Sequence, residues 1–218
     1  MYINKTCIIP IRKNSKSVRN KNIKKFKGKP LVFHVIEKCI KSKLFDKIII
    51  STDSKQYINI IKKKFKKKIF FNLRSKKNST GNAPTENVIK ETLQYKEYQN
   101  SEIIFLIQAT SPLLLEKDIL NSYKKFKKEK LDTLFTSYLS KKFVWQKKNN
   151  LCYPLNYDFK KRPMKQNFKG CYVENGAIYI FKHKNFKNFK NRLHGRIGTY
   201  LMPESRSLEV DSKNDFYY

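Results

Sequence analysis

The chain has 218 residues, long enough for one sizeable domain, and its 49 Lys and Arg residues against 17 Asp and Glu residues give a formal net charge of +32. Such a charge attracts polyanions, among them nucleic acids, acidic membrane surfaces and nucleotide phosphates. The four Cys residues lie far apart without a C-x-x-C pair, and no apolar run approaches the roughly 18 residues of a membrane span, so the composition disfavours a zinc site, a disulfide framework and a transmembrane helix. Since residues 1–6 also lack the profile of a signal peptide, we expect a soluble cytoplasmic protein.

Strand and helix patterns alternate along most of the chain. The expected elements are a strand at 6–11, a helix at 30–40, a strand at 47–51, a helix at 54–65, a strand at 69–72, a helix at 85–98, a strand at 102–108, a helix at 115–128 and a strand at 133–137. Strands that alternate with helices of ten or more residues are typical of βαβ units. The pattern therefore predicts an α/β fold with a doubly wound, mostly parallel sheet covered by helices on both faces.

Residues 141–170 interrupt this alternation. The segment is aromatic and basic and has little clear period, which predicts either a hairpin-like excursion or a subunit contact. Regular patterns return as strands at 177–182 and 197–202, and a short helix is expected at 215–218. We find no internal repeat and no Gly/Ser linker, so residues 1–218 are predicted to form a single domain that contains the excursion.

The loop after the first strand, residues 10–22, carries cations and short polar side chains. In an open parallel sheet, ligands bind beyond the carboxyl ends of the strands, which is where this loop lies. An arginine can grip phosphate oxygens with two hydrogen bonds, a lysine supplies a point charge, and loop N–H groups add dipoles. By charge alone, however, this is one more solvated basic loop in a very basic protein.

The order of residues in the loop is more specific than its charge. Arg12, Ser15, Lys16, Lys21 and Asn22 fall in the pattern A-R-x-x-S-K-x-x-x-x-K-N, with Ile11 in place of the Ala. Five further blocks follow in order: G-K-P-L at 28–31, F-D-K to S-T-D over 45–53, L-I-Q-A-T-S-P-L at 106–113, N-G-A-I-Y-I at 175–180 and S-L-E-V-D at 207–211. Together they resemble the acylneuraminate cytidylyltransferases (CMP-sialic acid synthetases) over about residues 6–216.

This resemblance implies a nucleotide-diphospho-sugar transferase-like fold and a transfer reaction. The anomeric hydroxyl of a sugar would attack the α-phosphate of CTP and expel pyrophosphate, which depends mostly on positioning and charge neutralisation. By the resemblance, the CTP-binding residues are Arg12, Ser15, Lys16, Lys21, Asn22, Arg74 and Thr85, with Arg74 and Thr85 near the cytosine and ribose. The catalytic residues implied are Lys21, at the reacting phosphate, together with Arg12 and Asp211.

The resemblance also implies a Mg²⁺ site formed by Asp211 and Glu209. Alternate residues of an extended segment point to one side, so both carboxylates would face the same ligand. The family usually has Asp where this chain has Glu209, and the extra methylene makes Asp211 the better candidate for direct ligation.

The sugar-binding residues implied are Gln108, Lys165 and Tyr179, although Tyr179 fits a core aromatic residue equally well. Lys165 stands where the family often has an Arg for the sugar carboxylate, so it keeps the charge without the two-pronged geometry. The family resemblance further predicts a homodimer that uses residues 141–170. The substrate class would be acidic nine-carbon sugars, such as N-acetylneuraminate or a legionaminate- or pseudaminate-type sugar.

Two alternatives remain open at this point. A related nucleotidyltransferase could act on an eight-carbon acid such as 3-deoxy-manno-octulosonate, although that branch usually lacks the S-K to K-N pattern in its first loop. A non-enzymatic basic domain could bind RNA or DNA, but the sequence has no helix-turn-helix signature and no recognised RNA-binding module, so specific nucleic-acid binding is not expected. Lys, Asn, Ile, Phe and Tyr share AT-rich codons, and codon bias is favoured over a selected surface as the origin of the charge.

Overall fold

A computed structural model of the chain describes residues 3–13, 15, 17–65 and 69–217, and its centre is a seven-stranded sheet. The strands follow the order β11-β7-β10-β6-β1-β4-β5. Their bounds are β1 (Lys5–Pro10), β4 (Lys47–Thr52), β5 (Ile69–Leu73), β6 (Ile103–Ile107), β7 (Thr133–Ser140), β10 (Cys171–Lys182) and β11 (Ile197–Leu201). Every neighbouring pair is parallel except those of β10, which runs antiparallel to β6 and β7. The predicted mostly parallel α/β sheet is confirmed.

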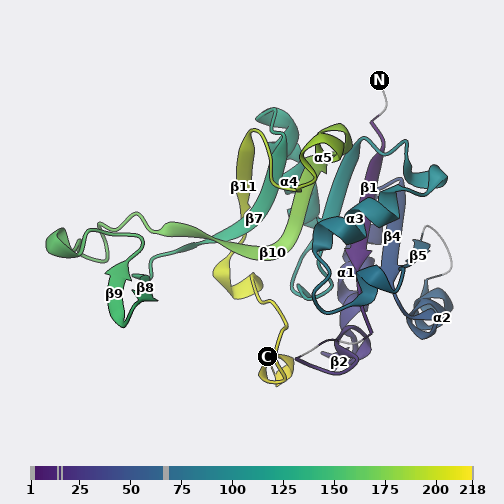
Figure 1. Cartoon of the computed structure of the whole chain (residues 1–218), viewed down its shortest axis with the longest axis horizontal. Coiled ribbons are helices and arrows are strands. Elements are labelled where there is room, and N and C mark those ends of the chain that lie inside the picture. Colours follow the sequence, from purple (N-terminus) through teal and green to yellow (C-terminus); the bar gives the residue numbers. More distant parts are fainter. Residues whose placement is uncertain (1–2, 14, 16, 66–68, 218) are drawn as a thin grey trace.

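Helices cover both faces of this sheet (Figure 1). Their bounds are α1 (Leu31–Lys41), α2 (Lys55–Lys64), α3 (Thr85–Leu93), α4 (Glu116–Lys128) and α5 (His183–Phe189). Successive strand residues point to opposite faces, so Cys7 and Ile9 pack with α1, α2 and α4, whereas Ile8 packs with α3 and α5. The central strands are buried on both sides, as expected for the near-continuous apolar runs in their sequences.

Several boundaries differ from the sequence prediction. The helix expected at 85–98 ends at Leu93, and a separate 3-10 turn at Lys96–Tyr98 follows, which lets Tyr98 bury its ring against the sheet. The strands β7 and β10 are longer than predicted because they continue to pair with each other beyond the sheet, up to Cys171 opposite Ser140. The helix α5 was not predicted, since among its seven residues only two, His183 and Phe186, are buried.

Several short elements lie outside the central sheet and its helices. In place of the helix expected at 215–218, the structure has a 3-10 turn at Asn214–Tyr217, and residue 218 lies outside the described residues. Two further pairs of short strands occur, β2 (Lys25–Phe26) with β3 (Lys29–Pro30), and β8 (Trp145–Lys148) with β9 (Leu151–Pro154). Within the described part of the chain, no helix is long and apolar enough to cross a membrane.

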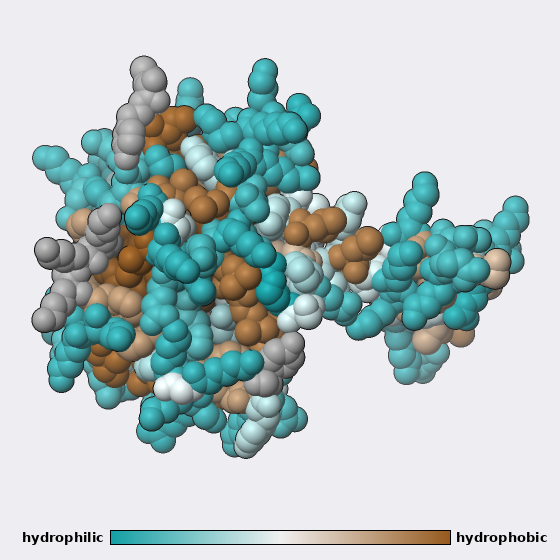
Figure 2. All heavy atoms as spheres, turned by 180° about the vertical axis from the view of Figure 1, so that it is seen from behind, coloured by the Kyte–Doolittle hydropathy of each residue, from teal (hydrophilic) through white to brown (hydrophobic). Residues whose placement is uncertain are grey.

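Residues 141–170 form an arm that leaves the body of the molecule between β7 and β10 (Figure 1). The arm carries the β8–β9 hairpin, whose two turn residues, Asn149 and Asn150, have φ values of 48° and 63°. Asn tolerates this left-handed conformation, and two such residues in succession suit a tight hairpin. The bounds of the arm agree with the predicted excursion, and Figure 2 shows apolar surface where the arm leaves the body.

Candidate active site

A cavity of about 310 Å³ opens beyond the carboxyl ends of β1, β5 and β6. A larger hollow of about 640 Å³ lies at the opposite edge of the sheet, but it contains none of the residues singled out from the sequence. The smaller cavity brings together nine of them: Arg12, Ser15, Lys21, Asn22, Arg74, Thr85, Gln108, Glu209 and Asp211. They come from five separate sequence blocks, so the fold gathers motifs that are up to 199 residues apart (Arg12 to Asp211, 211 − 12).

The loop after β1 is held in shape by its own polar contacts. The backbone N–H of Lys13 donates to the Asp53 carboxylate at 2.8 Å, and the side-chain amide of Asn22 donates to the carbonyl of Arg12 at 3.0 Å. Asn20 has a φ of 55°, the left-handed conformation that turns the chain into the short 3-10 helix Lys21–Ile23. These contacts fix the loop backbone before any ligand binds.

Lys21 is the buried cation of the cavity. Only 8% of the residue is exposed, and its Nζ donates to Oδ1 of Asp211 at 2.7 Å. The Asp211 side chain itself is mostly exposed and lines the cavity. A cation from the first loop and a carboxylate from the end of the chain thus meet at one point of the cavity wall.

Glu209 lies beside this ion pair. Partial burial and the neighbouring Asp211 carboxylate raise the pKa of Glu209, and the Lys21 ammonium offsets part of that shift. Gly176, with a φ of 68°, lies against the Glu209 carboxylate, and a Cβ at this glycine would be 3.3 Å from Oε1. The positive φ favours glycine at this position, and a side chain here would also displace the Glu209 carboxylate slightly.

The two carboxylates are suitable donors for a hard divalent cation. Magnesium prefers oxygen ligands, keeps several waters and is commonly held by one or two carboxylates together with substrate phosphates. A cation here would also relieve the repulsion that raises the pKa of Glu209. Among the described residues, no group of three or more His, Cys, Asp or Glu side chains could hold a metal by itself.

Arg74 forms the opposite wall of the cavity, directly after β5. Its Nε donates to Oγ of Ser51 at 3.0 Å and its Nη2 donates to the Ser51 carbonyl at 2.7 Å. Burial lowers the pKa of Arg74 to about 10, so the guanidinium stays charged at neutral pH. Because two bonds to Ser51 fix its orientation, this cation presents its remaining N–H groups in a defined direction.

Two sugar-site candidates lie away from the cavity. Lys165 is on the arm, beside Arg162 in a shallow hollow. Tyr179 is 4% exposed, its hydroxyl donates to Glu174, and the Arg192 guanidinium covers its ring at 4.6 Å. The packing of Tyr179 thus matches the core aromatic interpretation, whereas Gln108 does line the cavity. Lys16 lies outside the described residues.

The cavity also contains residues that the sequence did not single out as site residues. These are Pro10, Asn78, Thr80, Gly81, Ala83, Val88 and Thr110. Most belong to the loop after Arg74, which is tied down where Glu91 of α3 accepts hydrogen bonds from the backbone N–H and the hydroxyl of Ser75 at 2.6 and 2.9 Å. Residues 74–83 lie between a predicted strand and a predicted helix, so the sequence does place a loop at this end of the sheet. Its small and polar side chains, however, do not by themselves indicate a binding or catalytic role.

Known proteins with similar sequences indicate the family of the chain. Residues 6–215 match the model of a family described as cytidylyltransferase. The chain is 29% identical to an N-acylneuraminate cytidylyltransferase of Streptococcus agalactiae, over 97% of this chain and 51% of that protein. It is also 29% identical to a pseudaminic acid cytidylyltransferase of Campylobacter jejuni, over 97% of this chain and 93% of that protein. The chain thus spans about half the length of the Streptococcus relatives and most of the Campylobacter one.

Solved structures support the fold. A 4-diphosphocytidyl-2C-methyl-D-erythritol synthase from Anaerococcus prevotii superposes with a TM-score of 0.70 at 16% identity, over 99% of this chain and 95% of that chain. A CMP:2-keto-3-deoxy-manno-octonic acid synthetase complexed with CTP gives a TM-score of 0.66 at 14% identity, over 97% of this chain and 94% of that chain. With the family match over nearly the whole sequence and the motif residues gathered in one cavity, the chain belongs to the cytidylyltransferase family.

Proposed function

We propose that the chain transfers CMP from CTP to the anomeric hydroxyl of a sialic-acid-like nonulosonic acid. In this reaction the hydroxyl oxygen loses its proton and bonds to the α-phosphorus, the bond from that phosphorus to the bridging oxygen breaks, and pyrophosphate leaves. One observation carries the proposal: Arg12, Lys21 and Arg74 line the same cavity as Glu209 and Asp211. Three cations with two carboxylates fit a nucleoside triphosphate and its metal better than either ligand alone.

The cations have different tasks in this proposal. Lys21 is the most buried of them and would neutralise charge on the reacting phosphate, where a fixed donor contributes most. Arg12 and Ser15 would hold the outer phosphates, with Lys16 as a further predicted contact. Asn22, Arg74 and Thr85 would bind the nucleoside.

We further propose that Mg²⁺ is the cofactor, with Asp211 and Glu209 as its protein ligands. The metal would supply charge neutralisation on the phosphates. Asp211 is the better candidate because Glu209 stands where the family usually has Asp and is longer by one methylene, although both residues are exposed and line the cavity. Lys21 is paired with Asp211 in this structure, and a bound phosphate would compete with that carboxylate for the ammonium.

The substrate class is the nine-carbon acidic sugars. It rests on the names of the relatives, which are N-acylneuraminate and pseudaminic acid cytidylyltransferases. Gln108 would contact the sugar from the cavity wall, and Tyr179 stays a predicted contact although it does not line the cavity. A CTP-consuming enzyme works where the CTP pool is, so we propose that the reaction takes place in the cytoplasm.

A homodimer is proposed because Lys165 lies on the arm and not in the cavity of its own chain. An arm that crosses to a second copy could bring this cation to the partner's sugar site. The exposed apolar side chains of the arm and its base would then be covered, among them Leu139, Leu151, Leu155, Met164 and Tyr172. Replacing Leu151 and Leu155 by Ser should lower the mass measured by light scattering to that of a monomer, and an unchanged dimer would contradict this contact.

The activity is tested by pyrophosphate release from CTP and Mg²⁺ with a panel of acidic sugars. The panel contains N-acetylneuraminate, legionaminate, pseudaminate and 3-deoxy-manno-octulosonate. We expect release with at least one nine-carbon acid and much less with the eight-carbon acid. Release with the octulosonate alone would change the substrate class, and no release from folded protein with any acid would overturn the proposal.

A further inference from the structure

We propose that the ion pair between Arg206 and Asp118 positions the two carboxylates of the cavity and thereby sets the affinity of the site for Mg²⁺. Neither residue lines the cavity, so both would act through the segment that carries Glu209 and Asp211. The part of this inference that concerns metal rests on the proposed function. The part that concerns how the segment is held does not.

The segment that carries the carboxylates has no regular secondary structure to hold it. After β11 ends at Leu201, a single 3-10 turn at Glu204–Arg206 reverses the chain, and residues 207–211 then run along the cavity without joining the sheet. One backbone bond ties this run to the rest of the site, from the Val210 N–H to the Thr110 carbonyl at 2.8 Å. Val210, buried against Phe26 and Leu31, anchors the middle of the run, so the direction in which the carboxylates point depends on this anchor and on where the run begins.

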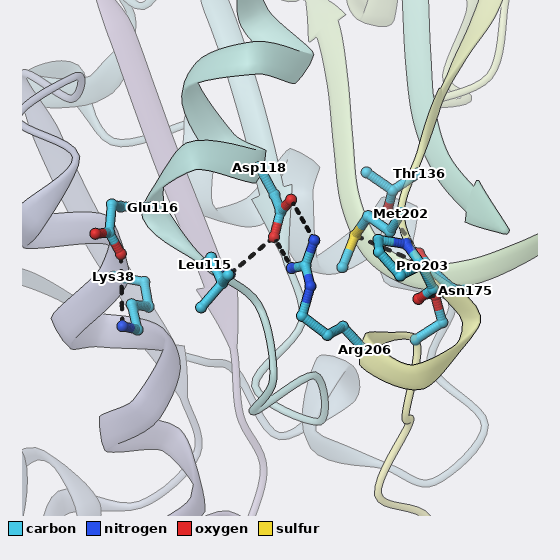
Figure 3. Close-up of polar contacts among 10 residues, drawn as sticks. Lys38, Leu115, Glu116, Asp118, Thr136, Asn175, Met202, Pro203 and Arg206 are labelled. Carbon is cyan, nitrogen blue, oxygen red and sulfur yellow. Dashed lines mark hydrogen bonds and ion pairs between the residues drawn. The ribbon is translucent and has the colours of Figure 1, made fainter.

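Arg206 fixes that beginning. Its guanidinium binds the Asp118 carboxylate with two hydrogen bonds, one from Nη1 to Oδ2 and one from Nη2 to Oδ1 at 3.0 Å (Figure 3). The Asp118 side chain is 1% exposed, and the Arg206 side chain is 23% exposed. A two-pronged arginine–carboxylate pair of this kind restricts both the distance and the angle between its partners.

Asp118 is itself fixed to the cavity's other side. Its Oδ2 also accepts the backbone N–H of Leu115 at 2.9 Å, which caps the first turn of α4. The loop before this turn carries Gln108 and Thr110 of the cavity wall. One buried carboxylate thus joins the loop after β6 to the turn before Glu209, so the two walls move together.

A second contact supports the same turn. The side-chain amide of Asn175 donates to Oγ of Ser207 at 3.0 Å, while its Oδ1 accepts the Thr136 hydroxyl at 2.7 Å. Figure 3 shows Asn175 and Met202 beside the turn and Arg206 reaching away from them to α4. Asn175 fixes the turn to the sheet, and Arg206 fixes it to the helix layer, so loss of Arg206 frees rotation without detaching the segment.

The variant that tests this is Arg206→Lys, which keeps the charge and removes the two-pronged geometry. We expect amide hydrogen exchange of residues 207–211 to become about tenfold faster or more, while exchange in β1 stays unchanged. Binding of Mg²⁺ in the presence of CTP should slow the amide exchange of residues 207–211. The Mg²⁺ concentration that produces half of this slowing should rise about 10- to 100-fold in the variant, as for other residues that orient metal ligands. The KM for CTP at saturating Mg²⁺ should change about threefold at most.

Glu204→Gln is the matched control. Glu204 lies in the same 3-10 turn, and its ion pair with Lys142 is solvent-exposed, with side chains 58% and 76% exposed. This variant should leave both the exchange of residues 207–211 and the Mg²⁺ requirement within twofold of the parent protein. A shift as large as that of Arg206→Lys would mean that any change in the turn has this effect, which would overturn a specific role of the pair.

A second variant separates positioning from folding. In Asp118→Asn combined with Arg206→Met, no buried charge is left unpaired and an amide oxygen at position 118 can still accept the Leu115 N–H, so the thermal midpoint should stay close to that of the parent. We expect it to show the raised Mg²⁺ requirement all the same. A normal Mg²⁺ requirement in this folded variant or in Arg206→Lys would overturn the inference. Failure of the proposed function would give a different result from failure of this inference. The parent protein would then release no pyrophosphate with any acid, whereas amide exchange would still show whether Arg206 holds residues 207–211.

Discussion

The cavity at the carboxyl ends of the strands and the arm at residues 141–170 differ in what holds their side chains. In the cavity, two of the cations are bonded within the chain: Lys21 to Asp211, and Arg74 to Ser51. The arm instead has a group of packed rings, such as Phe143 with Tyr157 at 4.4 Å between centroids. The arm has a small interior of its own, where Phe168 is the most deeply buried hydrophobic residue at 7% exposure among the described residues.

This difference indicates which half of the proposed substrate pair each region serves. A triphosphate needs cations at fixed distances, and the cavity supplies them from backbone-anchored loops. The arm offers a cation, Lys165, on a surface with exposed apolar side chains, which becomes a defined site only when a second surface covers it. Substitutions in the cavity should therefore lower kcat for the transfer, and substitutions in the arm should raise the KM for the sugar alone.

The largest effect is expected for Lys21→Ala. Removal of the buried ammonium should lower kcat for pyrophosphate release at least about 10³-fold, the upper range for loss of one fixed charge donor at a reacting centre. The thermal midpoint should change little, because Asp211, which loses its partner, is mostly exposed. Lys25→Ala, an exposed lysine four residues on, is the control and should keep its activity. Retained turnover in Lys21→Ala would remove this residue from the mechanism.

The next effect distinguishes the two carboxylates of the cavity. Asp211→Asn should lower kcat about 10²-fold at saturating Mg²⁺, and Glu209→Gln should lower it less, because the extra methylene of Glu209 makes Asp211 the better candidate for direct ligation. Titration of pyrophosphate release with Mg²⁺ measures both variants. The reverse order of effects would assign the main ligand to Glu209.

A smaller and more selective effect is expected in the arm. Lys165→Ala should raise the KM for the sugar about tenfold and leave the KM for CTP unchanged, since the cavity does not contain Lys165. Lys165→Arg should keep the sugar KM of the parent protein, because the positive charge is retained. Lys161→Ala removes a lysine elsewhere on the same arm and serves as the control. An equal rise in both KM values would contradict the division of labour between cavity and arm.

The sequence predicted the cavity well because its residues lie in short motifs at strand ends. Arg12, Lys21 and Asn22 follow β1 directly, and their order along the chain determines where they lie once the sheet is known. The central strands could be predicted equally well, since a run such as 47–51 has three consecutive Ile residues and fits a strand that is covered on both faces.

The parts that could not be predicted depend on contacts between distant segments. The Arg206–Asp118 pair joins residues 88 positions apart and has no local pattern. The lengths of β7 and β10 follow from their pairing with each other beyond the sheet, up to Cys171 opposite Ser140. Lys165 illustrates the limit of motif reasoning, because its matching position in the sequence did not place the side chain in the cavity.

The smallest predicted effect concerns the stability of the cavity without ligand. The pKa of Glu209 is raised in the folded protein, so ionisation of this carboxyl lowers the free energy of unfolding. The protein is most stable, as far as this group is concerned, below the pKa that Glu209 has in the unfolded chain. This stability is lost as the pH rises through the pKa of the folded state. Glu209→Gln should therefore raise the thermal midpoint at pH 7.5 by no more than about 2 °C.

The gain should shrink as the pH is lowered toward about 4, near the ordinary pKa of Glu. Glu204→Gln, an exposed carboxylate in the nearby turn, should show no such pH-dependent gain. Mg²⁺ with CTP should reverse the order at neutral pH, because bound metal stabilises the parent protein more than a variant that lacks one ligand. Scanning calorimetry of both variants at the two pH values checks these points. A midpoint for Glu209→Gln below that of the parent without ligand would mean that the ionised carboxylate stabilises the empty cavity, which contradicts a pKa raised by burial and by the Asp211 charge.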